Sequence, residues 1–435
     1  MLKLAEIKQI ILEQRSIFLR SDAIIQRQRL LESDFLYICN LREAIIITGV
    51  RRCGKSYLMK LIWQEIQKKL AIDDNNFLYF NFESEKLLDF TASHFDVLLS
   101  AYHEIFTSQK SQKVYLFFDE IQNISGWEKF ISRLIEDGKY KIFITGSNAS
   151  LLSKEIGTAL TGRNFSLQLF PVSFKEFYHF RAGGSMAKND WFDKEKTCVA
   201  KKLFFEYFEI GGFPEIVKNR FRPLLEEYLR NIIYRDIVLR RRIKYETSLR
   251  EIVQFVSSNI GVPLSLKKIC QMTKIKNLMT VKNYVSHLTD SFLFFTAHKH
   301  SYSIKSQIYN PDKFYLCDVG MYKEINLSPG KNDGRALENM VFNELMRRGF
   351  MVDYFSDKLE CDFVFHKKNK IIGVAQVCAN LTSDNKDREI GGLLSALKEY
   401  NLQSGLLLTM EEENEMVIDK KTIRCVPIYK WLLED

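Results

Sequence analysis

One stretch, from Ala44 to Lys60, limits the possible folds of this chain more than any other. It reads AIIITGVRRCGKSYLMK, which is four apolar residues, a loop with Gly49 and Gly54, and a helical continuation. The glycines remove side-chain bulk, so that backbone N–H groups and a helix N-terminus can hold phosphate at close range. A strand, this loop and a helix together form the context that the GxxxxGKS pattern needs. The stretch therefore predicts an α/β domain that binds ATP or ADP.

Two residues of the loop have expected roles of their own. Lys55 is expected to reach the terminal phosphates, and Ser56 to ligate Mg²⁺. For Arg51 and Arg52 three partners stay open: a phosphate, a neighbouring subunit or an acidic strand end. The residues expected to line the nucleotide are Gly49, Val50, Arg51, Arg52, Cys53, Gly54, Lys55, Ser56 and Tyr57.

An acidic pair ends a second apolar stretch, VYLFFDE, at Val114–Glu120. Its five apolar residues predict a central parallel strand, and ligands of open α/β sheets collect at the carboxyl ends of strands. Asp119 is therefore placed to hold Mg²⁺, directly or through water. Glu120 is placed to orient and deprotonate the water that attacks the phosphate.

Polar residues also follow a third predicted strand, Lys141–Thr145. Ser147 or Asn148 at its tip would contact the γ-phosphate or the attacking water, the position called sensor 1 in the AAA+ class; capping of the next helix is the alternative. Further along, Arg163 is a candidate for the arginine that compensates transition-state charge. It would act within the chain or across a subunit boundary, and the second case requires a homo-oligomer.

Several motifs, taken together, resemble the bacterial and archaeal AAA-type ATPases that carry a C-terminal domain of unknown function 4143. They are TGVRRCGKS, NFE at Asn81–Glu83, FFDEIQNISGWEKF, ITGSNASLL with TGR, GGFPE at Gly211–Glu215 and YRDIV at Tyr234–Val238. The resemblance spans nearly the whole chain and implies an AAA+ or STAND-like ATPase. It places GGFP where a sensor 2 region begins, close to the nucleotide; a plain interdomain turn is the alternative.

Charge and composition limit the partners of the chain. No run of about 18 apolar residues exists, so no segment is expected to span a membrane. The eight cysteines are scattered without a CxxC, as in reduced proteins of the cytoplasm. The net charge of +9 belongs to the middle of the chain, where Asn219–Arg250 and Ser265–Lys313 carry surpluses of five and six positive charges.

The basic middle segment has the pattern of a winged helix over residues 249–330. Two short helices with a brief connection have helix-turn-helix proportions, and two later apolar stretches could be wing strands. DNA binding follows from the positive surplus, although a protein-docking module is the alternative. The side chains expected to face phosphate are Lys267, Lys268, Lys274, Lys276 and Lys282.

The last segment has the order of elements of a PD-(D/E)xK nuclease. Such a site needs a carboxylate on a helix, an aspartate, and then Glu-x-Lys on the neighbouring strand. Glu338 and Asp362 match the first two positions, but the third reads Gln376, Val377, Cys378. The carboxylate has become an amide and the lysine is missing, so we predict a degenerate site. Lys386 is a candidate for a migrated lysine that no pattern supports.

These predictions combine into an α/β P-loop NTPase with a parallel sheet, a helical and winged-helix middle, and an α/β nuclease-like end. The expected parts are a helical lead-in (1–43), the ATPase domain (44–170), a helical segment (171–248), the winged helix (249–330) and the nuclease-like domain (331–435). The expected function is Mg²⁺-dependent ATP hydrolysis coupled to DNA or protein binding. An ATP-regulated nuclease, a nucleotide-dependent signalling or defence switch, and a DNA-binding regulator are the alternatives.

Overall fold

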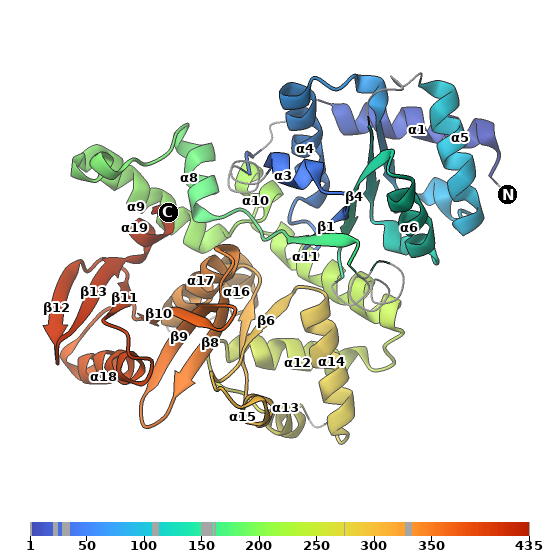
Figure 1. Ribbon diagram of the computed structural model, residues 1–435. Helices are drawn as coiled ribbons and strands as arrows, with labels where there is room; N and C mark the ends of the chain where they lie inside the picture. Colours follow the sequence, from blue (N-terminus) through green and yellow to red (C-terminus); the bar gives the residue numbers. More distant parts are fainter. Residues whose placement is uncertain are drawn as a thin grey trace. The chain divides into compact units, whose positions relative to one another are not determined.

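The chain forms two compact units in the computed structural model, residues 1–169 and 170–435 (Figure 1). The structure describes residues 2–20, 25–27, 35–106, 113–148, 160, 162–273, 275–326 and 333–434. The start of the helix that Ser147 or Asn148 was expected to cap, Thr161 of the TGR motif and Lys274 lie outside these residues. No helix in the described ranges is long and apolar enough to cross a membrane.

The first unit is built on a five-stranded parallel sheet in the order β2-β3-β4-β1-β5. Nearly every residue of β1 to β4 is buried, because helices cover both faces of the sheet and the strands are continuous apolar runs. The strands are β1 (Ala44–Thr48), β2 (Phe77–Asn81), β3 (Val114–Asp119), β4 (Tyr140–Gly146) and β5 (Asn164–Gln168).

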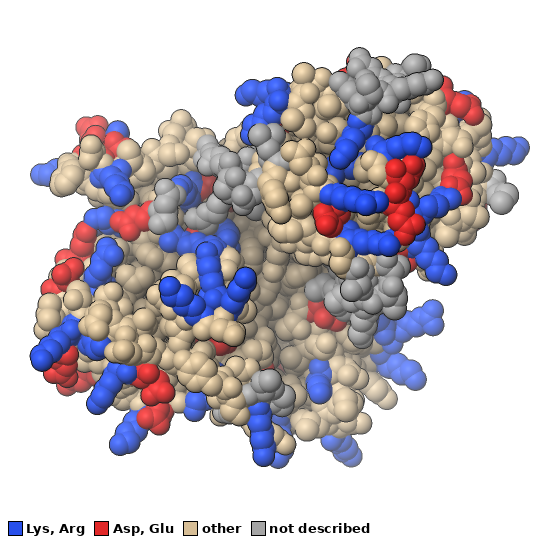
Figure 2. All heavy atoms as spheres, viewed as in Figure 1, with Lys and Arg blue, Asp and Glu red and all other residues tan. Residues whose placement is uncertain are grey.

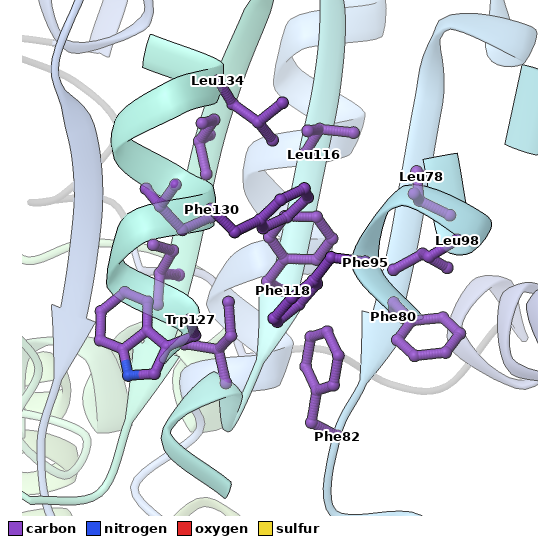
Figure 3. Close-up of a cluster of buried hydrophobic side chains, with 14 of the residues drawn as sticks. Leu78, Phe80, Phe82, Phe95, Leu98, Leu116, Phe118, Trp127, Phe130 and Leu134 are labelled. Carbon is purple, nitrogen blue, oxygen red and sulfur yellow. The ribbon is translucent and has the colours of Figure 1, made fainter. Parts of the chain in front are cut away.

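Alternate strand residues pack against different helices. Phe118 lies in a cluster with Phe95 and Phe130 on one face of the sheet (Figure 3). Phe117 points to the other face, where Trp63 stacks on Phe77 at a centroid distance of 4.6 Å. The α-helices within the described residues of this unit are α1 (Leu4–Leu19), α3 (Phe35–Asn40), α4 (Lys55–Leu70), α5 (Phe95–Ile105) and α6 (Trp127–Asp137).

The helix α1 belongs to the core of the first unit. It packs against α5 and β2, and its Ile7 and Ile11 are buried in the same cluster as Phe118. At the amino edge of the sheet, the buried Lys141 of β4 donates to the carbonyl oxygens of Leu41 and Glu43, at 2.9 and 3.0 Å. The N-terminal segment is therefore more than the lead-in that its polar sequence suggests.

The second unit begins with helices and continues with a three-helix segment and a small sheet. The strands β6 (Phe294–Ala297) and β7 (Lys313–Leu316) pair antiparallel, and Leu264 forms a bridge to Asp312 beside them. The helices are α8 (Phe174–Ala182), α9 (Lys194–Ile210), α10 (Pro214–Asn219), α11 (Leu224–Asn231), the π-helix Ile232–Leu239, α12 (Glu246–Ser258), α13 (Leu266–Met272), α14 (Leu278–Asp290), α15 (Ile304–Tyr309) and α16 (Val319–Ile325).

The end of the second unit is a six-stranded mixed sheet in the order β12-β13-β11-β10-β9-β8. Phe363 contacts Phe342 of α17, whereas its neighbour Val364 lies in the cluster under α18, so the two helices cover opposite faces. The strands are β8 (Met351–Ser356), β9 (Glu360–Lys367), β10 (Lys370–Val377), β11 (Ser404–Thr409), β12 (Asn414–Ile418) and β13 (Lys421–Pro427). The helices are α17 (Asp333–Arg347), α18 (Ser383–Glu399) and α19 (Ile428–Leu433).

The fold class predicted from the sequence is confirmed. A strand, phosphate loop and helix stand in a parallel sheet, and β4 lies between the loop strand β1 and the acidic strand β3. This arrangement is a P-loop NTPase fold, and a mixed-sheet domain follows it.

Candidate nucleotide site

The phosphate loop joins the end of β1 at Thr48 to the start of α4. Gly49 has a φ of 151°, and Gly54, which caps α4, has a φ of 100°, values that side chains other than glycine rarely permit. Space also excludes a side chain at Gly49, since a Cβ there would lie 2.2 Å from the carbonyl oxygen of Leu169. The loop backbone is therefore free to approach a ligand closely.

The side chains of the loop point in different directions. Those of Val50 and Cys53 are buried, and burial raises the pKa of the Cys53 thiol, so both residues offer a ligand only backbone groups. Arg51 donates to Glu83, just after β2, at 2.9 Å. This bond is consistent with the acidic partner among the three left open for Arg51, and its contact with phosphate or a neighbouring subunit stays a prediction. Arg52 is exposed and has the left-handed φ of 70° that is uncommon outside glycine.

Lys55, at the first turn of α4, lies beneath the loop. Its Nζ donates to the carbonyl oxygens of Gly49 and Val50 at 3.1 and 3.3 Å. The same ammonium lies 3.6 Å from Oε1 of Glu120. The side chain is only 5% exposed, so its charge acts in a region of low dielectric where electrostatic interactions are strong.

Three hydroxyl groups surround the carboxylate of Asp119 at the end of β3. Ser56 and Tyr79 donate to Oδ2 at 2.6 and 2.8 Å, and Thr145 of β4 donates to Oδ1. Burial and the neighbouring Glu120 raise the pKa of Asp119, whereas the three hydroxyls oppose that change. The structure thus brings the predicted Ser56 and Asp119 together.

Sequence reasoning missed Tyr79 and Thr145. Both lie near the carboxyl ends of strands that flank β3, and the paired register Asn81 to Asp119 puts Tyr79 two residues from the end of β2. Polar side chains near the carboxyl ends of neighbouring strands lie close together. This rule could have found both residues if the strand order had been known.

Glu120 lies directly after β3 in an unusual backbone conformation. Its φ of 52° is left-handed, and its N–H donates to the Thr145 hydroxyl at 2.9 Å. Its carboxylate accepts a hydrogen bond from Gln122 and faces Lys55. Non-glycine residues in this conformation gather at functional sites, because surrounding contacts must hold them there.

Ser147 and Asn148 follow β4 between the loop strand and the acidic strand. Both side chains are buried, at 1% and 2% exposure. The Ser147 hydroxyl forms no hydrogen bond with any part of the chain that the structure describes. The alternative helix-capping role concerns residues that follow 148 and lie outside the described ranges.

Arg163 lies at the amino ends of the parallel strands, whereas the phosphate loop lies at their carboxyl ends. Its carbonyl accepts from the N–H of Ala44, at the start of β1, and its guanidinium bonds Ser132 and Glu136 of α6. A strand rises by about 3.3 Å per residue, so Arg163 is separated from the loop by roughly 13 Å. Both expected roles of Arg163 stay predictions, and this separation favours action across a subunit boundary.

The GGFPE and YRDIV motifs belong to the second unit. Gly212 donates to Oδ2 of Asp318 at 2.7 Å, and a Cβ on Gly211 would lie 2.0 Å from Oδ1 of the same residue. The glycines are thus required by close packing on the start of α16, which favours the turn interpretation over sensor 2. Tyr234–Val238 lies in the π-helix.

Four of the lysines predicted to face phosphate lie on α13, on α14 and just before α14. In this region α12, α13, α14 and the β6–β7 pair follow one another in the predicted order. Lys and Arg side chains project from much of the surface in Figure 2. The predicted phosphate-facing lysines that are exposed are Lys267, Lys268, Lys276 and Lys282.

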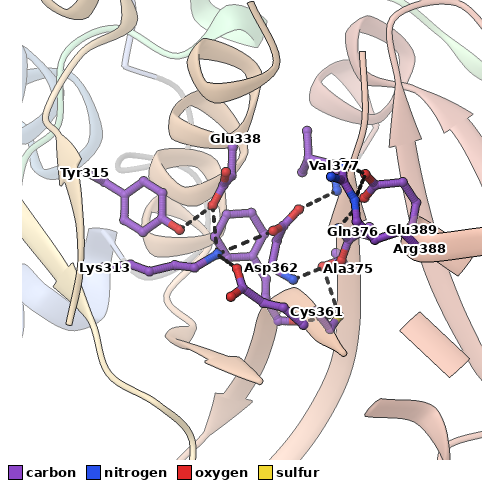
Figure 4. Close-up of polar contacts among 12 residues, drawn as sticks. Lys313, Tyr315, Glu338, Cys361, Asp362, Ala375, Gln376, Val377, Arg388 and Glu389 are labelled. Atoms are coloured by element: carbon purple, nitrogen blue, oxygen red, sulfur yellow. Dashed lines mark hydrogen bonds and ion pairs between the residues drawn. The ribbon is translucent and has the colours of Figure 1, made fainter. Parts of the chain in front are cut away.

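The predicted nuclease-like residues lie together in the C-terminal domain (Figure 4). The N–H of Asp362 donates to Oε1 of Gln376 at 3.0 Å. The carboxylates of Glu338 on α17 and of Asp362 face the same ammonium, that of Lys313. The Gln376 amide donates in turn to Oε2 of Glu389 on α18, at 2.6 Å. Cys378 stands where the pattern needs a lysine two residues after Gln376, and Lys386 is exposed on α18.

The comparisons with known proteins agree with the nucleotide-binding fold of the first unit. Residues 41–178 match the family model of an AAA domain. The chain is 37% identical over 407 residues to an uncharacterized protein of Methanocaldococcus jannaschii, covering 89% of this chain and 88% of that protein. The two proteins belong to one family. An uncharacterized protein of Haemophilus influenzae belongs with them, at 33% identity over 399 residues and 89% and 94% coverage.

A second model match differs from the resemblance that the motifs suggested. Residues 201–330 of this family member match domain of unknown function 8612, whereas domain 4143 is not shown. Among solved structures, the ORC2 protein of Aeropyrum pernix covers 77% of this chain and 98% of its own, with 12% identity and a TM-score of 0.39. The replication initiator DnaA bound to AMPPCP and single-stranded DNA covers 65% and 92%, with 16% identity and a TM-score of 0.27. Scores this low add nothing to the assignment.

Proposed function

We propose that this protein hydrolyses ATP with Mg²⁺ at the carboxyl edge of its parallel sheet. The observation that carries the proposal is the 2.6 Å hydrogen bond from Ser56 to Asp119, which joins the phosphate loop to the acidic strand. The AAA-domain match over residues 41–178 supports it. ATP and water are the substrates, and ADP and inorganic phosphate are the products, with ADP bound by the same loop before its release.

The residues at this edge fit a magnesium ion. Mg²⁺ prefers oxygen ligands and few protein groups, and the Ser56 hydroxyl and the Asp119 carboxylate supply them side by side. Tyr79 and Thr145 hold the carboxylate in place by donating to both of its oxygens. A bound Mg²⁺ would neutralise negative charge on the phosphate oxygens.

The other side chains have complementary tasks in the reaction. Lys55 supplies a fixed positive charge for the terminal phosphates, and Glu120 accepts the proton of the attacking water. The buried Ser147 hydroxyl has an unused hydrogen bond for the γ-phosphate or that water. Asn148 is the alternative for the same contact. In a homo-oligomer, Arg163 of a neighbouring copy would compensate the charge that develops in the transition state.

We further propose that the nucleotide state controls DNA binding by the second unit. The four exposed lysines on and next to α13 and α14 favour a phosphate backbone as the partner. The order of three helices followed by a strand pair supports a winged helix. A protein partner is the alternative, and it predicts binding that depends little on salt.

The deciding experiment measures the ATPase rate of the full chain with no DNA, with duplex DNA and with single-stranded DNA. Stimulation of wild type by DNA, absent in the Glu120→Gln variant, supports both parts of the proposal. Turnover without any effect of DNA supports the ATPase alone. Turnover in Glu120→Gln equal to that of wild type contradicts the role of Glu120.

A further inference from the structure

Lys313 is a lysine in an unusual place. It begins β7 and pairs with Ala297 of β6, yet its side chain is only 1% exposed. Lysine is rarely buried so completely unless its charge is paired. The ammonium must therefore find its partners inside the protein.

The partners are three carboxylates of the C-terminal domain, drawn in part in Figure 4. Nζ of Lys313 lies 2.7 Å from Oε1 of Glu360, 3.3 Å from Oε1 of Glu338 and 3.4 Å from Oδ1 of Asp362. An ammonium has three N–H donors, so these contacts can satisfy all of them. Burial alone would lower the pKa of Lys313, but the three carboxylates raise it, and the lysine stays charged.

Other groups from the middle segment close over Glu338. Tyr315, two residues along β7 and on the same side of the strand, donates to Oε1 of Glu338 at 2.7 Å. The backbone of Gly261 covers the other oxygen, since a Cβ there would lie 2.4 Å from Oε2. The helix carboxylate that a nuclease would turn toward its metal is thus occupied by its own chain.

The position of Lys313 also differs from that of a catalytic lysine. In the Glu-x-Lys pattern the lysine follows the acidic residue along its strand and points toward phosphate. Lys313 comes from another sheet and lies among the acids. A divalent cation at the same carboxylates would be repelled by the ammonium and would have to displace it.

We propose that Lys313 takes the place of a divalent cation in this nuclease-like pocket. The three carboxylates form a binding site for a primary ammonium group. The group that occupies this site is the side chain of Lys313, on β7 of the middle segment. The retained Glu338 and Asp362 then fasten β7 to α17 and β9, and the C-terminal domain cleaves no nucleic acid.

The test compares Lys313→Ala with wild type by thermal unfolding of the full chain, with and without Mn²⁺. Removing one partner of a buried ion pair leaves uncompensated charge, so the midpoint should fall by roughly 5–10 °C. Mn²⁺ should restore part of that stability in Lys313→Ala, beyond any shift that Mn²⁺ causes in wild type through the nucleotide site. Its effect should disappear in the double variant Lys313→Ala/Asp362→Asn. The control Lys305→Ala, an exposed lysine between β6 and β7, should change neither quantity.

A second measurement serves if Lys313→Ala does not fold. Lys313→Met with Glu338→Gln removes one positive and one negative charge together, and it should unfold at a higher temperature than Lys313→Met alone. Failure of Mn²⁺ to bind folded Lys313→Ala would overturn the proposal. Two results with the lysine in place would also overturn it. They are Mn²⁺ binding and Mg²⁺-dependent DNA cleavage, if either is lost when Asp362→Asn is introduced.

Discussion

The hydroxyl of Ser56 donates to the carboxylate of Asp119 across 2.6 Å, although 63 residues separate the two in the chain. One residue opens the helix after the phosphate loop, and the other ends the acidic strand. Since β4 lies between β1 and β3, the two strand ends meet around the tip of a third strand, which carries Ser147. Any ligand of the loop therefore also meets the acidic pair and this hydroxyl.

Replacing Glu120 by glutamine should leave ATP binding intact and lower turnover about 100-fold or more, because the amide cannot take the proton of the water. Lys55→Ala should instead weaken binding itself. Fluorescent-nucleotide titration and steady-state phosphate release separate the two effects. Loss of binding in Glu120→Gln would mean that its carboxylate has a structural role through Lys55.

Tyr79→Phe should raise the Mg²⁺ concentration needed for half-maximal ATPase activity several-fold. The variant loses one of the donors that orient Asp119, while the ring keeps its stacking on Phe18 at a centroid distance of 3.8 Å. Tyr102→Phe is a matched control, because that hydroxyl bonds the carbonyl of Asn75 away from the site. Equal Mg²⁺ dependence in wild type and Tyr79→Phe would contradict the positioning role of this hydroxyl.

Arg163→Ala should reduce ATPase activity only where copies of the chain assemble. Mixing Arg163→Ala with Glu120→Gln should then recover activity above the sum of the separate preparations, since a mixed pair contains one complete site. Glu136→Ala removes the partner of Arg163 on α6 and controls for a purely structural effect. No recovery on mixing would exclude the role across subunits.

Neutralising Lys276 and Lys282 should weaken DNA binding and make it less dependent on salt. For every lysine that no longer meets a phosphate, the slope of log K against log salt should decrease by about one. Fluorescence anisotropy at several salt concentrations measures this slope. Lys188→Ala, an exposed lysine far from α14 in the sequence, is the control, and an equal effect of both changes would indicate binding elsewhere.

Lys141→Met should alter the pH dependence of stability. Burial lowers the pKa of Lys141 to about 8 from its ordinary 10.5, so between these values the unfolded chain binds a proton that the folded chain lacks. Wild-type stability from this group therefore rises with pH across that window, by up to about 3 kcal/mol. Urea unfolding measures the free energy of unfolding of both proteins near pH 7.5 and near pH 10. The difference between wild type and Lys141→Met should increase in favour of wild type at the higher pH. An equal difference at both pH values would contradict the prediction.

The sequence predicts the sheet of the first unit well, because each buried strand is a continuous apolar run followed by polar residues. It also predicts Lys55, Ser56, Asp119 and Glu120 as site residues from their chemistry and spacing, and the structure brings these residues together. The order of the strands is not visible in the sequence. The sequence therefore does not show that Arg163 precedes a strand whose start pairs with Ala44, away from the loop.

Like the strand order, the interactions between distant segments of the chain are not visible in the sequence. Lys313 is 25 residues from Glu338 and 49 from Asp362, and it belongs to a segment that the charge pattern assigns to DNA binding. Nothing in its neighbourhood distinguishes it from the exposed lysines before it. Only the packing of β7 against α17 shows that this lysine is internal.

The burial of Lys313 has a consequence for how the second half of the chain can be divided. A protein cut near residue 330 would carry a charged amine with no counter-ions, and the remaining piece would carry three acids with no cation. Neither fragment should fold as well as the whole. Recombination between related genes would then keep β7 and the C-terminal sheet together, although the sequence motifs suggest a domain boundary between them.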